Sequence, residues 1–179
     1  LKRKKDIVLF DIFKNLKEKC FIIAEIGSNH QGSIELAKQL ISEAKKNGAS
    51  AVKFQKRDNA NLFTKELYDQ VYDNKNSFGE TYGKHREALE FGEKEFQEIK
   101  KYCLEQNIIF FSTAFDKESV NFLDSIGVEL FKIASADLIN IPLIDYIASK
   151  NKTIVLSTGG GTIEDIKLAV NTILNYHEK

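Results

Sequence analysis

The sequence predicts an α/β fold of the (β/α)8 barrel (TIM-barrel) type, present as roughly its first five βα units. Short apolar runs alternate five times with amphipathic helical patterns, which is the order that builds a parallel sheet. Each apolar run also ends in polar groups, and a barrel gathers the carboxyl ends of all its strands around one mouth, whereas an open doubly wound sheet needs them only at its switch point. A complete barrel takes about 200 to 250 residues or more. The 179 residues are therefore expected to be part of one.

The first predicted strand covers residues 21–26 and leads into a polar turn. Glu25 stands at the C-terminal end of the strand, Gly27 and Gly32 bracket the turn, and a helical pattern then runs to Gly48. An acid at the end of a buried strand, followed by a polar loop and a helix, is typical of the places where α/β folds carry chemistry. The alternative is that Glu25 caps the loop or pairs with a lysine.

The second predicted strand, residues 51–55, alternates and places Lys53 and Gln55 on one face. A lysine inside a short apolar strand is costly unless an anionic group meets it. A long polar segment follows over residues 56–92. Segments of this length usually cover or bind a ligand, and the alternative is a variable insertion with a helix or two of its own.

The remaining units repeat the plan of a buried strand followed by a capped helix. We expect these strands to be apolar and buried on both faces. Thr162 with Asp165 resembles a capping box, and the helix after it is expected to bury an apolar face that includes Val170. The predicted strands are 108–113, 129–134 and 153–157, and the helical patterns cover 93–106 and follow Asp116, Pro142 and Thr162.

Polar groups stand at the ends of these later strands as well. Thr113 ends the third strand, Lys132 with Ser135 the fourth, and Ser157 the fifth. Residues 159–161 are three glycines ahead of a helix, where backbone N–H groups could approach a phosphate. A flexible turn has the same composition.

Two lysines and several hydroxyls around one mouth predict a site for a phosphorylated or carboxylated small molecule. A single buried lysine is more often part of an ion pair, but Lys53 and Lys132 occupy equivalent strand positions. A Schiff-base aldolase is one alternative, with either lysine as nucleophile. It needs a depressed lysine pKa, and the carboxylates and hydroxyls nearby in sequence favour the charged form. A non-catalytic domain that binds an anion or a sugar is another alternative.

Composition narrows the class of protein. The 26 basic and 26 acidic residues leave no net charge to attract nucleic acid or a membrane. Cys20 and Cys103 form neither a metal spacing nor a disulfide framework, and the sequence shows no signal peptide or long apolar span, which predicts a cytoplasmic protein. His30 is expected to orient the first loop by hydrogen bonds rather than to bind metal. Residues 1–20 are predicted to be a lead-in segment and residues 21–179 the barrel part.

A set of short segments in a fixed order carries a likeness to one known family. They are residues 24–32 (AEIGSNHQG), 52–55 (VKFQ), 82–83 (YG) with 86–90 (REALE), 112–115 (STAF), 132–137 (KIASAD) and 156–159 (LSTG). From about residue 20 to the end, the chain resembles the sialic acid synthase family, which includes N-acetylneuraminate, legionaminate and pseudaminate synthases and spore-coat polysaccharide proteins.

The resemblance implies a transferase of carbohydrate biosynthesis that condenses phosphoenolpyruvate with an N-acetylated aldehyde sugar such as N-acetylmannosamine. The products would be a nonulosonic (sialic-type) acid and phosphate, released with C–O cleavage. By the same resemblance Glu25 moves a proton at the reacting centre or the attacking water, Asp137 assists at the sugar end, and Gln55 meets the acceptor sugar. Many bacterial members carry Glu where this chain has Asp137. The implied phosphoenolpyruvate ligands are Lys53, Thr113, Lys132, Ser135 and Ser157.

The resemblance also implies parts that this sequence does not contain. A divalent metal, Mn²⁺ or Mg²⁺, is expected in the complete enzyme, bound by histidines on later barrel strands, so no metal ligand is expected in this chain. A C-terminal antifreeze-like domain completes the partner's site in the family, which implies a homodimer at full length. The 179 residues are accordingly expected to be inactive alone.

Overall fold

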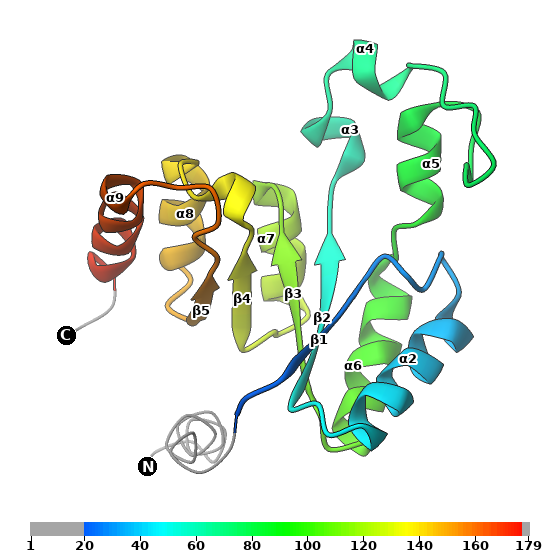
Figure 1. The fold of residues 1–179 in the computed structure, drawn as a ribbon, viewed down its shortest axis with the longest axis horizontal. Coiled ribbons are helices and arrows are strands. Elements are labelled where there is room, and N and C mark those ends of the chain that lie inside the picture. Colours follow the sequence, from blue (N-terminus) through cyan, green and yellow to red (C-terminus); the bar gives the residue numbers. More distant parts are fainter. Residues whose placement is uncertain (1–19, 177–179) are drawn as a thin grey trace.

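The computed structural model describes residues 20–176. The predicted lead-in segment, with its possible strand at residues 7–10, lies outside the described residues apart from Cys20. Within the described range, alternating strands and helices follow the predicted order (Figure 1).

The described strands form one parallel sheet in the order β1-β2-β3-β4-β5. Each strand lies beside its neighbour in sequence, as in consecutive βα units of a barrel. The strands are β1 (Ile23–Gly27), β2 (Ala51–Lys56), β3 (Ile109–Ala114), β4 (Leu130–Ile133) and β5 (Thr153–Leu156).

The connecting helices all cover one face of this sheet. The larger apolar cluster joins one set of alternate strand residues, such as Val52, Phe54 and Phe131, to buried residues of every connecting helix. The smaller cluster, around Phe111 and Leu130, lies on the other face and contains no helix residue. A doubly wound sheet would carry helices on both faces. The connecting helices are α2 (Ile34–Lys46), α6 (Glu93–Glu105), α7 (Lys117–Ser125), α8 (Ile141–Ala148) and α9 (Ile163–Leu174).

Residues 57–92 form an excursion that stands beyond the carboxyl end of β2 (Figure 1). The sequence alternative is an insertion with one or two helices of its own. The structure shows three short helices here, each capped at its N-terminus by a side chain. They are α3 (Asn59–Leu62), α4 (Lys65–Tyr68) and α5 (Tyr82–Ala88), and a 3₁₀ turn, η2 (Ser135–Asp137), follows β4.

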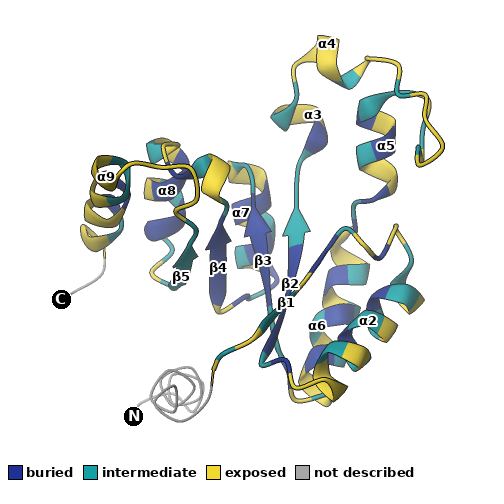
Figure 2. Ribbon diagram, viewed as in Figure 1, coloured by how far each residue is buried: buried dark blue, intermediate teal, exposed yellow. Residues whose placement is uncertain are grey.

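The expectation that every strand is buried on both faces is wrong for the two outer strands. Figure 2 shows burial concentrated on β2, β3 and β4, while β5 is half-buried throughout and Glu25 of β1 is exposed. Among the described residues β1 and β5 each pair on one side only, so their second edge has no neighbouring strand to cover it. Val170 of α9 is likewise exposed, at 38%, against the prediction.

The loop after β1 is fixed to the excursion at Gly32. Its φ of +77° lies in the left-handed region, and a Cβ built there would be 2.5 Å from the carbonyl oxygen of Ala88. Gly48 after α2 also has a positive φ, of +87°, but a Cβ there would meet nothing within 4 Å. Only glycine therefore allows the close approach at Gly32.

These two glycines give a matched pair of variants. We expect Gly48→Ala to lower the free energy of unfolding by about 1 kcal/mol, from the left-handed backbone alone. Gly32→Ala should cost at least about 1 kcal/mol more, because the Ala88 carbonyl must also move. Urea denaturation of both variants measures the difference, and equal losses would show that the two segments are not in contact.

Candidate functional site

Pairing between strands gathers the predicted site residues on one face and at one edge of the sheet. Lys53 lies opposite Glu25, and Thr113 lies opposite both Gln55 and Lys132. Because side chains alternate along a strand, these residues share the face of the smaller apolar cluster, away from the helices. The carboxyl ends of β1 to β4 therefore present their polar groups to one mouth.

Lys53 is the centre of this mouth. It is 3% exposed, its Nζ lies 2.8 Å from Oε2 of Glu25, and it donates a hydrogen bond of 3.2 Å to Oγ1 of Thr113. The Glu25 side chain itself is 60% exposed. The sequence alternative in which Glu25 pairs with a lysine is thus what the structure shows, and the pairing places the acid at the mouth formed by the strand ends.

Lys132 is the second buried ammonium group, and it donates a hydrogen bond of 2.6 Å to the carbonyl oxygen of Ile133. Burial lowers the pKa of Lys132, and the charge of Lys53 lowers it further, against smaller raising effects of Glu25 and Asp137. The nearby carboxylates therefore favour the charged form of Lys132, as expected, but burial and Lys53 outweigh them in the direction of its pKa. Two ammonium groups that repel each other across one mouth favour the binding of an anion between them.

Asp137 lies in η2, beyond the end of β4. Burial raises its pKa, opposed by a hydrogen bond of 3.3 Å from Asn140 and by the charges of Arg57 and Lys132. Its Oδ2 atom is buried and has no hydrogen-bond partner among the described residues. Asp137 is therefore a carboxyl group with one oxygen left for a ligand.

The other predicted site residues, Ser135, Ser157 and Gln55, lie near the strand ends but make no direct contact with the two lysines among the described residues. Ser135 is exposed and lies beside Gly159, where a Cβ would be 3.6 Å from its own Cβ. Ser157 is half-buried, and its backbone N–H donates to Ile133. Gln55 is half-buried near Gly27. Within residues 20–176, no hydrogen bond joins the Ser135 or Ser157 hydroxyl to the lysines. The strand ends bring the predicted residues to one edge of the sheet, but direct side-chain contacts join only Glu25, Lys53 and Thr113 among these described residues.

His30 holds the loop that follows Glu25. It is 3% exposed, its Nδ1 accepts a hydrogen bond from the Gly32 backbone, and its ring stacks on Phe91 at 3.9 Å between centroids. Burial lowers the pKa of His30 to about 4, against a hydrogen bond with the Gly27 backbone that raises it. The neutral imidazole therefore orients this loop by hydrogen bonds, as expected.

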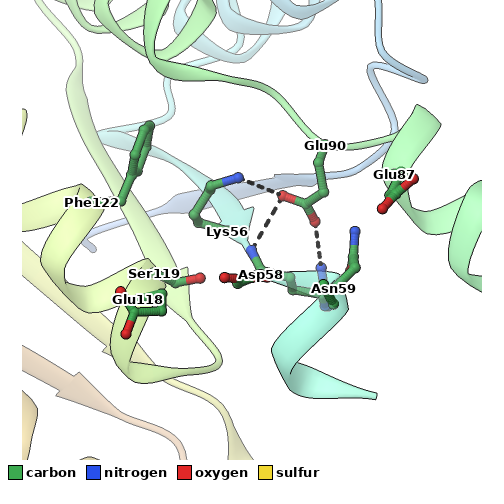
Figure 3. A pocket seen from close by; sticks show the side chains of 10 residues that line it. Lys56, Asp58, Asn59, Glu87, Glu90, Glu118, Ser119 and Phe122 are labelled. Carbon is green, nitrogen blue, oxygen red and sulfur yellow. Dashed lines mark hydrogen bonds and ion pairs between the residues drawn. The ribbon is translucent and has the colours of Figure 1, made fainter. Parts of the chain in front are cut away.

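A second polar cluster, which the sequence analysis missed, lies at the base of the excursion around Glu90. Its carboxylate accepts from Lys56 at 3.4 Å and from the backbone N–H of Arg57 at 3.2 Å (Figure 3). The Arg57 guanidinium lies 3.7 Å from Glu90 and stacks over the Phe115 ring at 3.9 Å. Burial raises the pKa of Glu90, opposed by Lys56 and Arg57. Two signals in the sequence point to this cluster: the run of charges directly after β2 and the segment 86–90 (REALE), which ends in Glu90.

A cavity of about 410 Å³ adjoins this cluster, between the excursion and α7 (Figure 3). Arg57, Asn59, Ser119 and Phe122 are among the residues that line it. The Asn59 Oδ1 and Ser119 Oγ atoms are buried and have no hydrogen-bond partner among the described residues. The cavity carries both signs of charge, because Lys56 and Arg57 face acidic side chains there.

Residues 20–176 contain no group of three or more His, Cys, Asp or Glu side chains placed to hold a metal ion. They do not by themselves fit the divalent cation that the resemblance implies. The same part of the chain contains no helix long and apolar enough to cross a membrane.

Together the fold and the site define a class: a parallel β/α protein whose strand ends form a cationic mouth bearing one acid, suited to small anionic ligands. The sequence profile of the NeuB family matches residues 40–179, and the chain belongs to this family.

Similar proteins agree with that assignment. N-acetylneuraminate-9-phosphate synthase of Drosophila melanogaster is 40% identical over 93% of this chain and 45% of its own length. The N,N'-diacetyllegionaminic acid synthase of Legionella pneumophila is 36% identical over 88% and 45%. A crystal structure of N-acetylneuraminic acid synthetase from Leptospira borgpetersenii superposes with a TM-score of 0.74, at 35% identity, over 89% of this chain and 51% of that one. The chain spans about half the length of these relatives.

The buried His30 predicts a dependence of stability on pH. Its folded pKa of about 4 lies below its ordinary 6.5, so the unfolded chain binds more protons between these values. Its contribution is present above pH 6.5 and is lost as the pH falls toward 4. From pH 7 to pH 5 the loss should be about 2 kcal/mol.

Urea denaturation at both pH values, on wild type and His30→Phe, tests this. The variant keeps a ring on Phe91 but does not titrate, so its pH-dependent loss should be smaller. A residual slope is expected from His85, whose pKa burial also lowers. An identical pH dependence in both proteins would contradict a depressed pKa at His30.

Proposed function

We propose that this chain supplies the phosphoenolpyruvate-binding part of a sialic-type acid synthase. The reaction would join phosphoenolpyruvate to an N-acetylated aldehyde sugar such as N-acetylmannosamine, giving a nonulosonic acid and phosphate. Membership of the NeuB family supports the reaction class. The observation that carries the proposal is the Lys53 ammonium, shared between Glu25 and Thr113 at a mouth that also holds Lys132.

The two lysines would supply charge for the phosphate and carboxylate of phosphoenolpyruvate. Because Lys53 and Lys132 are buried, their attraction for an anion is little screened by water. Thr113, Ser135 and Ser157 would fix the orientation of the bound molecule by hydrogen bonds. The bound anion would also relieve the repulsion between the two ammonium groups.

Glu25 would act on the proton of the reacting centre or of the attacking water. A carboxylate beside Lys53 competes with a bound anion, so a role as a simple ligand contact is unfavourable. Arrival of phosphoenolpyruvate would free Glu25 from its ion pair, and its largely exposed side chain can then accept a proton. Asp137 and Gln55 would face the acceptor sugar, with the unpaired Oδ2 of Asp137 available to one of its hydroxyls.

We also propose that the sheet belongs to a (β/α)8 barrel completed in a longer protein. Helices on one face, the single pairing of β1 and β5 among the described residues, and coverage of about half of each relative support this. The divalent metal, Mn²⁺ or Mg²⁺, would then be bound by residues of the remaining part, and the complete protein would be a homodimer.

Titration of phosphoenolpyruvate by calorimetry tests the mouth. Lys53→Met should weaken binding at least about tenfold, because a buried countercharge is lost. Glu25→Gln should leave the affinity unchanged or raise it, since a competing carboxylate is removed. Lys101→Met, an exposed lysine on α6, is the control and should bind as wild type does. Unchanged affinity in Lys53→Met would rule out this mouth as the binding site.

Turnover separates the roles of Glu25. In the full-length protein, with phosphoenolpyruvate, N-acetylmannosamine and Mn²⁺, phosphate release should fall by about 10²–10⁴-fold in Glu25→Gln. Parallel loss of binding and turnover would show that Glu25 organises the loop. Turnover close to wild type would remove its catalytic role.

A Schiff-base aldolase is a second candidate, favoured by one observation: burial and Lys53 lower the pKa of Lys132. Borohydride reduction in the presence of pyruvate, followed by mass spectrometry, tests it. We expect no lysine adduct, because the Lys132 ammonium group is held by its hydrogen bond to the Ile133 carbonyl. A pyruvyl adduct on Lys132, absent in Lys132→Met, would favour the aldolase.

A further inference from the structure

Arg86 on α5 is a cation without a counter-ion. It is half-buried, and its guanidinium makes no hydrogen bond or ion pair with any residue of the described range 20–176. Its Nε atom is fully enclosed and has no partner. The neighbouring Glu87 carboxylate instead accepts a hydrogen bond from the Tyr68 hydroxyl. A buried Nε–H group without a hydrogen-bond partner costs free energy unless an acceptor meets it.

Arg57 is a second guanidinium with too little negative charge around it. Its side chain is 11% exposed, and its Nη1 is buried without a hydrogen-bond partner among the described residues. The Glu90 carboxylate, 3.7 Å from the Arg57 guanidinium, also forms an ion pair with Lys56. Burial lowers the pKa of Arg57, and the charge of Arg86 lowers it further, so the two guanidinium groups lie within electrostatic range of each other. Lys56 and Arg57 thus share one buried carboxylate, and Arg86 has no carboxylate partner among the described residues.

Arg57 relates this cluster to Gln55 and Asp137, the two residues proposed to meet the acceptor sugar. Arg57 follows Gln55 by two residues, and its charge lowers the pKa of Asp137. The Arg57 guanidinium stacks on Phe115, which fixes its plane. An acceptor sugar held at Gln55 and Asp137 would therefore extend one end toward Arg57 and Arg86.

The chemistry of the missing group follows from the donors. Two guanidinium groups with free N–H donors match a phosphate, whose oxygens accept from both in bidentate geometry. The relatives leave the choice open, since one is named for a 9-phosphate product and another for N,N'-diacetyllegionaminic acid. The choice between a phosphorylated and a free acceptor sugar therefore rests on the local charge of this chain.

We propose that Arg57 and Arg86 bind a phosphate ester on the acceptor, so that this chain selects a phosphorylated N-acetylated hexosamine over the free sugar. The proposal rests on the proposed function, because it assumes that the acceptor lies at Gln55 and Asp137. Arg57 and Arg86 then determine specificity for the acceptor.

Calorimetric titration of the full chain, saturated with phosphoenolpyruvate, tests this with three probes: N-acetylmannosamine 6-phosphate, N-acetylmannosamine and inorganic phosphate. We expect the sugar phosphate to bind at least about tenfold more tightly than the free sugar. Arg86→Gln and Arg57→Gln should each remove most of that preference while leaving the affinity for free sugar unchanged. Lys84→Gln, an exposed lysine on α5 paired with Glu80, should keep it.

Folding is a control in the same experiment. Among residues 20–176 Arg86 has no side-chain partner to lose, so Arg86→Gln should keep or raise the melting temperature. This variant carries the test if Arg57→Gln unfolds. A lower melting temperature in Arg86→Gln would show a structural partner and contradict the proposal.

The outcomes separate this inference from the proposed function. If phosphoenolpyruvate binds but both sugars bind equally, the phosphate site is wrong and the synthase assignment stands. Inorganic phosphate that binds as tightly as the sugar phosphate, with the same dependence on Arg86, would show an anion site unrelated to the acceptor. Failure of phosphoenolpyruvate itself to bind overturns the proposed function and, with it, this inference.

Discussion

The buried ammonium group of Lys53 is the constraint around which the mouth is arranged. A charge that is 3% exposed inside an apolar sheet requires partners, and it takes one from each neighbouring strand, Glu25 from β1 and Thr113 from β3. These contacts fix the relative positions of three strand ends. They also leave an ion pair that an incoming anion can exchange, because the Glu25 side chain is largely exposed.

The excursion of residues 57–92 is tied to this mouth from two sides. Gly32 contacts the Ala88 carbonyl, and His30 stacks on Phe91, so the loop after Glu25 rests on the end of the excursion. Glu90 binds Lys56 and Arg57 at the start of the same excursion. Both ends of a segment without a strand in the sheet are therefore anchored beside the acid. This anchoring is what allows a long polar segment to hold side chains over a ligand.

Positive charge exceeds what the local carboxylates neutralise at two places along the mouth. Lys53 with Lys132 forms one, and Arg57 with Arg86 forms the other, and Asp137 is in electrostatic range of both Arg57 and Lys132. Such an arrangement suits a ligand pair with negative charge at both ends and a polar, uncharged middle. The energetic reason is that each anion removes a repulsion already present in the protein.

The sequence by itself determined the repeating units, because strand and helix patterns, the caps at Asp116 and Thr162, and Gly48 after α2 depend on neighbours a few residues away. It also placed polar groups at every strand end. Only the tertiary structure decided which of these meet. Lys53 and Thr113 are 60 residues apart, and Lys56 and Glu90 are 34 apart, so strand register and the path of the excursion bring them together. Local patterns likewise cannot give the direction of the Lys132 pKa or show that Arg86 lacks a partner among the described residues, because desolvation and distant charges act through space rather than along the chain.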